Sequence, residues 1–256
     1  MKPSVLVLSG YGINCEEETA YGFNLAGGKA KIVHINDLIS GLQKLKNFQI
    51  LAFPGGFSYG DDTGSGKAFA NRLRNHLWEK VQTFIKKDRL VIGICNGFQI
   101  MVNLGLLPGA LTHNDTARYL DRWVDLKVKN KSPWLRGISN ISLPIAHGEG
   151  RFYAPASVLK TLNQKKLIAL DYFEGDMCRY QNLKPNPNGS VKNIAGITDE
   201  TGKLLGLMPH PERAIFFTQL PNWPLIKESY KRTNRKIPSQ GQGLQIFKNA
   251  VKYFKL

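Results

Sequence analysis

The sequence lacks a long apolar run. Its first hydrophobic stretch, SVLVLS at residues 4–9, is short and is bounded by Lys2, Pro3 and Gly10. A membrane-spanning helix needs about 20 apolar residues, and a secretory leader ends in a small-residue cleavage site that is not found here. These absences argue against a membrane protein and against a secreted one, so we expect a cytoplasmic protein.

Cysteine is scarce. The 256 residues contain three thiols, Cys15, Cys95 and Cys178. An odd and small number of cysteines without secretory features argues against a disulfide framework and indicates reduced thiols. One of the three is therefore available as a working nucleophile.

Acidic residues are few: 19 Asp and Glu stand against 35 Lys and Arg, which gives a formal charge of +16, most of it after residue 128. Such a surface attracts anions, for example nucleic acid, an acidic partner protein or a phosphorylated ligand. The sequence has no RNA-binding aromatic signature and no basic recognition helix, so we expect a solvated basic surface or partner docking and no nucleic acid. It also has no G-x-G-x-x-G fingerprint and no metal-ligand spacing, so we predict no metal and no cofactor in this chain.

Strand-like runs alternate with helical patterns through the first hundred residues. The expected strands are 4–9, 30–35, 49–53 and 89–94, and the expected helices are 15–25, 70–87 and 96–104. Such alternation predicts a mostly parallel sheet with helices on both faces. Shorter strands separated by Asn, Gly and Pro turns follow at 123–128, 141–147, 167–173, 191–197 and 204–208, and they predict a mixed or antiparallel extension of the sheet.

We therefore predict an α/β fold in one domain over 1–256. Within it, residues 219–256 form an irregular connection, rich in proline and basic residues up to residue 243, and then a C-terminal helix. Leu244, Phe247 and Val251 give that helix one apolar face.

Cys95 is the most informative cysteine. It ends the apolar run 91–94 and is followed at once by a helical pattern, with Gly93 and Gly97 on either side. A nucleophile on a sharp strand-to-helix turn needs small neighbours, and the helix N-terminus favours a thiolate and can hold an oxyanion. An arbitrary cysteine in such a run is more often a small buried residue, but the two glycines weaken that interpretation.

A base and a group to orient it follow another apolar run. His210 and Glu212 are two residues apart, between prolines, directly after LLGLM at 204–208. In an extended segment this spacing puts both side chains on one side, so the carboxylate can fix the imidazole tautomer. A His-x-Glu sequence alone is a weak signal, but together with the cysteine turn it predicts nucleophilic catalysis.

A glycine-rich loop follows the run 49–53. Gly55, Gly56 and Gly60 lie in it, and its backbone N–H groups could complete an oxyanion hole with that of Asn96. The segment by itself fits a plain glycine turn equally well.

Together these segments resemble the class I glutamine amidotransferases, in the order Pro54-Gly55-Gly56, Gly93 to Gln99 and His210-Pro211-Glu212. Further stretches resemble the glutaminase subunits of phosphoribosylformylglycinamidine synthase, an enzyme of purine synthesis, and extend the likeness over nearly the whole chain. These stretches are 12–16, 55–62 with 68–73, 147–152, 193–213 and 243–251. The resemblance implies the flavodoxin-like fold of that family.

The resemblance also implies a mechanism. The Cys95 thiolate attacks the glutamine side-chain amide, His210 protonates the departing ammonia and then activates water against the thioester, and Glu212 holds His210. The substrate-binding residues implied are Gly55, Gly56, Asn96, Gln99, His147, Gly148 and Phe152, with oxyanion contacts from the N–H groups of Gly56 and Asn96. A structural role for His147 stays open, and for Cys15 packing is the interpretation we adopt.

Proteins of this kind work in a complex. The resemblance implies that ammonia passes to a large synthetase subunit, which uses ATP and Mg²⁺ and converts formylglycinamide ribonucleotide to formylglycinamidine ribonucleotide, with a small third subunit. A hypothesis is that Lys231, Arg232, Arg235 and Lys236 contribute to docking.

Two other functions fit parts of the sequence. A free-standing glutamine or γ-glutamyl hydrolase of the same fold would need no partner for full turnover. A binding protein that uses the cysteine as a redox sensor would need no His-x-Glu, so the presence of His210 and Glu212 argues against it.

Overall fold

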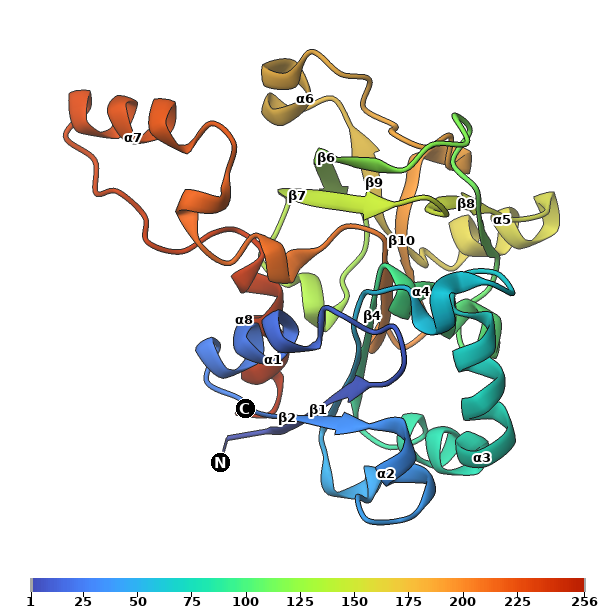
Figure 1. The fold of residues 1–256 in the computed structure, drawn as a ribbon. Coiled ribbons are helices and arrows are strands. Elements are labelled where there is room, and N and C mark those ends of the chain that lie inside the picture. Colours follow the sequence, from blue (N-terminus) through green and yellow to red (C-terminus); the bar gives the residue numbers. More distant parts are fainter. Residues whose placement is uncertain (1, 256) are drawn as a thin grey trace.

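Residues 2–255 are described by a computed structural model of the chain, built around a nine-stranded sheet (Figure 1). The strand order is β2-β1-β3-β4-β11-β10-β9-β6-β7. The strands are β1 (Ser4–Ser9), β2 (Lys29–His34), β3 (Ile50–Phe53), β4 (Leu90–Ile94), β6 (Leu120–Val128), β7 (Asn140–His147), β9 (Ile168–Phe173), β10 (Ile194–Thr198) and β11 (Leu204–Leu207). A separate pair is formed by β5 (Ala110–Thr112) and β8 (Arg151–Tyr153).

The sheet changes character at β11. Strands β2, β1, β3, β4 and β11 are parallel, whereas β10, β9, β6 and β7 pair antiparallel. Every residue of β3, β4 and β11 is buried, as expected for parallel strands that are covered on both faces. The predicted α/β fold, a mostly parallel sheet with an antiparallel extension, is confirmed.

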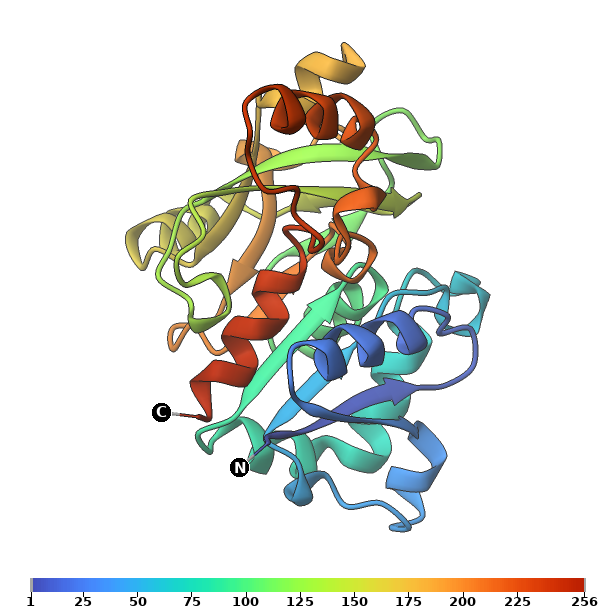
Figure 2. The ribbon, with the colours of Figure 1, turned by 90° about the vertical axis from the view of Figure 1, so that its left-hand side faces the viewer.

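Helices cover both faces of the parallel half. In Figure 2, α1 (Glu16–Leu25) and α8 (Leu244–Tyr253) lie in front of the sheet, and α3 (Lys67–Ile85) lies behind it. Helix α4 (Asn96–Leu104) packs on α3 and follows β4 directly. The remaining α-helices are α2 (Ile35–Ile39), α5 (Ala156–Gln164), α6 (Asp176–Gln181) and α7 (Trp223–Arg232).

The prediction of an irregular connection after residue 219 is wrong at helix α7. The irregular connection expected up to residue 243 contains this helix of ten residues, which stands away from the main sheet in Figure 1. Pro224 lies in its first turn, where a missing N–H costs nothing, and Trp223 and Ile226 pack on a small cluster around Phe217. The prolines and basic residues concealed this pattern in the sequence. The C-terminal helix itself was predicted correctly as α8.

Within the described residues 2–255, no helix combines the length and the apolar character needed to cross a membrane.

Candidate active site

The neighbouring parallel strands β4 and β11 bring the cysteine and the histidine segments together. They run in register, with Leu207 beside Ile94, and the N–H of Cys95 donates to the carbonyl of Leu207 at 2.8 Å. The carboxyl ends of parallel strands meet at one edge of a sheet, where α/β proteins bind their ligands. Cys95 and the segment after β11 therefore emerge at the same edge.

Cys95 occupies a strained turn. Its backbone has φ 52° and ψ −107°, and helix α4 begins at the next residue. A non-glycine residue in such a conformation costs about 1–3 kcal/mol, and strain of this kind gathers at functional sites. A Cβ at position 97 would lie 1.9 Å from the carbonyl oxygen of Phe53, so only glycine lets α4 approach β3 this closely. The glycine requirement read from the sequence thus has a geometric cause.

His210 and Glu212 form a buried pair. Nδ1 of His210 lies 2.5 Å from Oε1 of Glu212, and both side chains are almost fully buried. Burial alone lowers the pKa of His210, but the negative charges of Glu212 and Cys95 outweigh burial and hold this pKa well above its usual value. Nδ1 is hydrogen-bonded to Glu212, so Nε2 is the ring nitrogen available for proton transfer. Nε2 has no hydrogen-bond partner among the described residues.

The outer edge of β7 contacts the segments of both Cys95 and His210. Strand β7 ends the sheet, and its Pro144 has no N–H to pair, as is usual at an edge. The carbonyl of Pro144 accepts from the N–H of His210 at 2.8 Å, and that of Ala146 accepts from the thiol of Cys95 at 3.6 Å. Alternate carbonyls of one strand point the same way, so this edge places Cys95 and His210 side by side.

The glycine loop lies between the histidine and the start of the chain. A Cβ on Gly55 would lie 2.8 Å from Cε1 of His210. Gly56 has φ 151° and forms a bridge with Ile13, and a Cβ there would lie 2.7 Å from the carbonyl oxygen of Gly12. Gly55, predicted to bind substrate, and Gly56, predicted for an oxyanion contact, thus have no room for a side chain.

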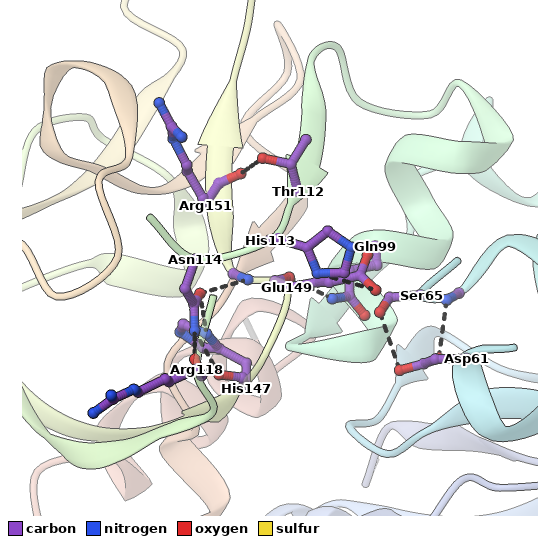
Figure 3. Close-up of polar contacts among 12 residues, drawn as sticks. Asp61, Ser65, Gln99, Thr112, His113, Asn114, Arg118, His147, Glu149 and Arg151 are labelled. Carbon is purple, nitrogen blue, oxygen red and sulfur yellow. Dashed lines mark hydrogen bonds and ion pairs between the residues drawn. The ribbon is translucent and has the colours of Figure 1, made fainter. Parts of the chain in front are cut away.

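Asn96 and Gln99 join helix α4 to the loop after β7. Asn96 donates to Oε1 of Gln99 at 2.8 Å, and Gln99 donates to the backbone oxygen of Glu149 at 2.6 Å. Figure 3 shows Gln99 beside Glu149, with Asp61 and Ser65 on the other side. The predicted Gln99 and the start of the loop from 147 therefore meet.

His147 is buried, and Asn114 fixes its ring. Nδ1 lies 3.0 Å from Oδ1 of Asn114, which also accepts from the N–H of Gly150, while the amide nitrogen of Asn114 donates to two carbonyls (Figure 3). Nδ1 therefore carries the proton, and Nε2 is an acceptor without a partner among the described residues. Burial lowers the pKa of His147 to about 3, so the ring is neutral.

The other two predicted substrate-binding residues, Gly148 and Phe152, lie in different surroundings. The carbonyl of Gly148 accepts from the N–H of Asn114 at 2.9 Å, which places Gly148 in the same loop as His147. Phe152 is 1% exposed and stacks on Phe98 of α4, with ring centroids 6.3 Å apart. Its side chain therefore packs against helix α4 in the core and does not line the site.

Three residues near the site were not predicted from the sequence to act there. Cys15, treated as a packing residue, lies within 4.8 Å of His210 and Glu212 through its sulfur, and Arg213 donates to that sulfur at 3.0 Å. Asp61 accepts from Asn96 at 3.3 Å, and burial raises the pKa of its carboxyl. The position of Cys15 between β1 and α1, directly before the helix, was the available signal for it.

Cys15, His210 and Glu212 are the one close grouping of metal-ligand types found among residues 2–255. The imidazole in it is hydrogen-bonded to Glu212, and the thiol to Arg213. We assign it no metal, and the absence of a metal and of a cofactor stays a prediction.

An apolar cavity of about 420 Å³ lies elsewhere, between α3 and the segment 38–46. Leu38, Leu45, Leu77 and Phe84 line it, and none of the predicted site residues does. The cavity is therefore separate from the predicted site residues.

Comparisons with known proteins agree with this geometry. A model of the CobB/CobQ-like glutamine amidotransferase domain matches residues 2–254. The chain is 49% identical to phosphoribosylformylglycinamidine synthase subunit PurQ of Methanococcus maripaludis, over 99% of each chain. It is 42% identical to the protein of that name from Dehalococcoides mccartyi, over 98% of each.

The solved structure of PurLQS from Thermotoga maritima contains a similar chain. It superposes with a TM-score of 0.75 at 28% identity, and the match covers 99% of this chain and 100% of that one. A glutamine amidotransferase from Thermotoga maritima has a TM-score of 0.53 at 13% identity, over 100% of this chain and 93% of that one, and shares the fold.

Proposed function

Because the chain belongs to the CobB/CobQ-like glutamine amidotransferase family, and within it to the relatives named phosphoribosylformylglycinamidine synthase subunit PurQ, we propose that it is the glutaminase subunit of that synthase. It hydrolyses glutamine to glutamate and ammonia. The ammonia passes to the synthetase subunit, which converts formylglycinamide ribonucleotide to formylglycinamidine ribonucleotide. The observation that carries the proposal is the strained Cys95 turn beside the buried His210–Glu212 pair.

In the proposed reaction, Cys95 is the nucleophile. Its thiolate attacks the side-chain amide carbon of glutamine, and His210 gives a proton to the amine as the carbon–nitrogen bond breaks, which releases ammonia and leaves a glutamyl thioester. His210 then takes a proton from a water that attacks the thioester, and glutamate leaves as the thiol is restored. Glu212 holds the ring and stabilises the imidazolium, as its 2.5 Å contact with Nδ1 supports.

The oxyanion of each tetrahedral intermediate is assigned to backbone N–H groups of Gly56 and Asn96. Asn96 is the first residue of α4, and the first N–H groups of a helix have no partner within it. The helix dipole adds positive potential at this point. The close packing of Gly55 and Gly56 supports a preorganised loop.

Glutamine binding is assigned to Gln99 and to the loop that begins at His147 and Gly148. The amide of Gln99 can hydrogen-bond the amino-acid end of the substrate. Nε2 of His147 is buried against Gly150, so His147 is assigned to this site through its position in the loop. Phe152 has an indirect role in this proposal, because it supports α4 through Phe98.

The partners are assigned from the similarity to the PurQ subunits. We assign two further proteins to the complex, the large synthetase subunit with its ATP and Mg²⁺, and a small third subunit. No cofactor is assigned to this chain. We treat residues 1–256 as one functional domain in a cytoplasmic enzyme.

The test is glutamate release from glutamine by the purified chain, alone and with the synthetase subunits, ATP, Mg²⁺ and formylglycinamide ribonucleotide. We expect turnover in the complete mixture, little by the chain alone, and none with Cys95→Ala. Full turnover by the chain alone would identify a free-standing hydrolase. Undiminished turnover with Cys95→Ala would contradict the proposed nucleophile.

A further inference from the structure

Cys15 lies against the catalytic pair but is not a second nucleophile. Its thiol donates to Oδ1 of Asn14 at 3.3 Å and accepts from Nη2 of Arg213 at 3.0 Å. A group that both donates and accepts in this way is a neutral thiol. Burial acts in the same direction, since it raises the pKa of Cys15. A buried neutral thiol so close to His210 and Glu212 needs another explanation.

Arg213 is close enough in the chain to compete with His210 for the carboxylate of Glu212. It follows Glu212 in the chain, and a guanidinium beside a buried carboxylate normally forms a strong, often bidentate, ion pair. Oε2 of Glu212 is buried without a hydrogen-bond partner among the described residues, so it is open to such a contact. Arg213 instead turns to the sulfur of Cys15 and to Oε1 of Glu18, which lies 3.8 Å from its Nε.

Resting on the proposed function, we propose that Cys15 and Glu18 are positioning residues that hold Arg213 away from Glu212, so that the carboxylate stays with His210. The charge of Glu212 is what keeps the imidazolium stable beside Cys95. If Arg213 paired with Glu212, this charge would be compensated and the imidazolium would be weakened. The imidazolium would then stabilise a Cys95 thiolate less, and Cys95 would be a weaker nucleophile.

The side chain of Cys15 can be tested separately from its backbone. The N–H of Cys15 donates to the carbonyl of Gly55 at 3.2 Å and so helps to hold the glycine loop. Any residue except proline can make this bond. A substitution of Cys15 therefore leaves the loop contact in place and removes the thiol alone.

The titratable groups around His210 come from several elements. They are Glu212 and Arg213 in its own segment, Cys95 after β4, Cys15 before α1, His147 at the end of β7 and Tyr119 before β6. His147 stays neutral above about pH 3, and Tyr119 has a pKa raised chiefly by burial. Near neutral pH, Arg213 is therefore the group in this set whose change of partner would compensate the charge of Glu212.

The experiment measures alkylation of Cys95 by iodoacetamide across a pH series in the full chain, with the modified site read by peptide mass spectrometry. With Cys15→Ala, we expect the rise of the Cys95 alkylation rate to move up by about one pH unit, with about a tenfold lower rate near neutrality. Cys15→Ser keeps an acceptor for Arg213 and should retain most of the original profile. Cys178→Ala removes a buried thiol outside the site and is the matched control.

The decisive variant is Cys15→Ala combined with Arg213→Gln. Without the guanidinium nothing competes for Glu212, so the original profile should return. A normal profile in Cys15→Ala, or a double variant as impaired as Cys15→Ala, would overturn the proposal. If Cys15→Ala does not fold, Glu18→Gln releases Arg213 from its other partner at a more exposed position and must shift the profile in the same direction.

This readout is independent of glutamine turnover. A chain that shows the expected alkylation shifts but releases no glutamate in any mixture would contradict the proposed function and leave the role of Cys15 standing.

Discussion

At the scale of single residues, the catalytic proposal depends on close backbone contacts that exclude side chains. Cys95 has a positive φ, and α4 can follow it only because residue 97 has no Cβ. The sequence revealed this requirement, since glycines flank a cysteine at the end of an apolar run. Cys15 was harder to assign, because its position between a strand and a helix does not by itself show that this strand ends beside His210.

The requirement at Gly97 can be tested by stability. In Gly97→Ala the new Cβ meets backbone at 1.9 Å, so β3 and α4 must separate, and we expect a loss of about 2 kcal/mol or more in the free energy of unfolding. Gly105→Ala is the control: its φ is also positive, at 78°, but nothing lies within 4 Å of the new Cβ, so about 1 kcal/mol is expected. Urea unfolding measures both. Equal losses would contradict the packing explanation.

His147 makes stability depend on pH. Its pKa is about 3 in the folded chain and about 6.5 when unfolded, so between these values the unfolded state binds the extra proton. Stability from this group is therefore complete above pH 6.5 and is lost as pH falls, by about 2 kcal/mol at pH 5. We expect His147→Gln to lose less stability than the wild type between pH 6.5 and pH 5 in urea titrations. An identical pH dependence in the two proteins would refute the assignment.

At the scale of elements, the strands of the parallel half were predictable because each is a continuous apolar run. Strand β4, for example, begins within one residue of the expected position, at Leu90. Helix α7 was missed because its proline and basic residues are also typical of loops, and tertiary packing of Trp223 decides the matter. The role of β7 was also unpredictable, since its edge carbonyls act through backbone atoms that any sequence supplies.

Helix α8 offers a test at this scale. Asn249 donates to the carbonyls of Trp134 at 2.9 Å and Arg136 at 2.8 Å, and so ties the helix to the turn before β7. Asn249→Leu leaves these carbonyls without the amide donor, and we expect a loss of about 2 kcal/mol in thermal or urea unfolding. Lys252→Leu, on the exposed side of the same helix, should change stability little. Similar effects for the two variants would contradict the role given to Asn249.

At the scale of the whole molecule, the net charge of +16 has no part in the fold or in the proposed site. Part of it gathers at the end of α7 and just beyond, in Lys231, Arg232, Arg235 and Lys236, on a helix that stands away from the sheet in Figure 1. An exposed basic segment steers an acidic partner surface, with a strong dependence on salt. Docking through this segment remains a hypothesis.

Charge reversal tests the hypothesis that this basic segment docks the partner. We expect the four-fold variant with Glu at positions 231, 232, 235 and 236 to have at least tenfold lower affinity for the synthetase subunit in low salt, by titration calorimetry, and the difference to shrink as salt rises. Reversal of Lys160, Lys165 and Lys166, in and just after α5, is the control; it reverses three charges instead of four and should have a smaller effect per reversed charge. Unchanged affinity of the α7 variant would exclude this docking surface.

The most direct test of the central claim is covalent trapping of the nucleophile. The chain in its complete complex is treated with 6-diazo-5-oxo-L-norleucine, a glutamine analogue that alkylates an attacking thiolate, and the labelled peptide is identified by mass spectrometry. The account predicts one label, on Cys95, with loss of glutamate release in proportion to labelling and protection by glutamine. Labelling of Cys15 or Cys178 in parallel with the loss of activity, or full activity after Cys95 is labelled, would contradict it.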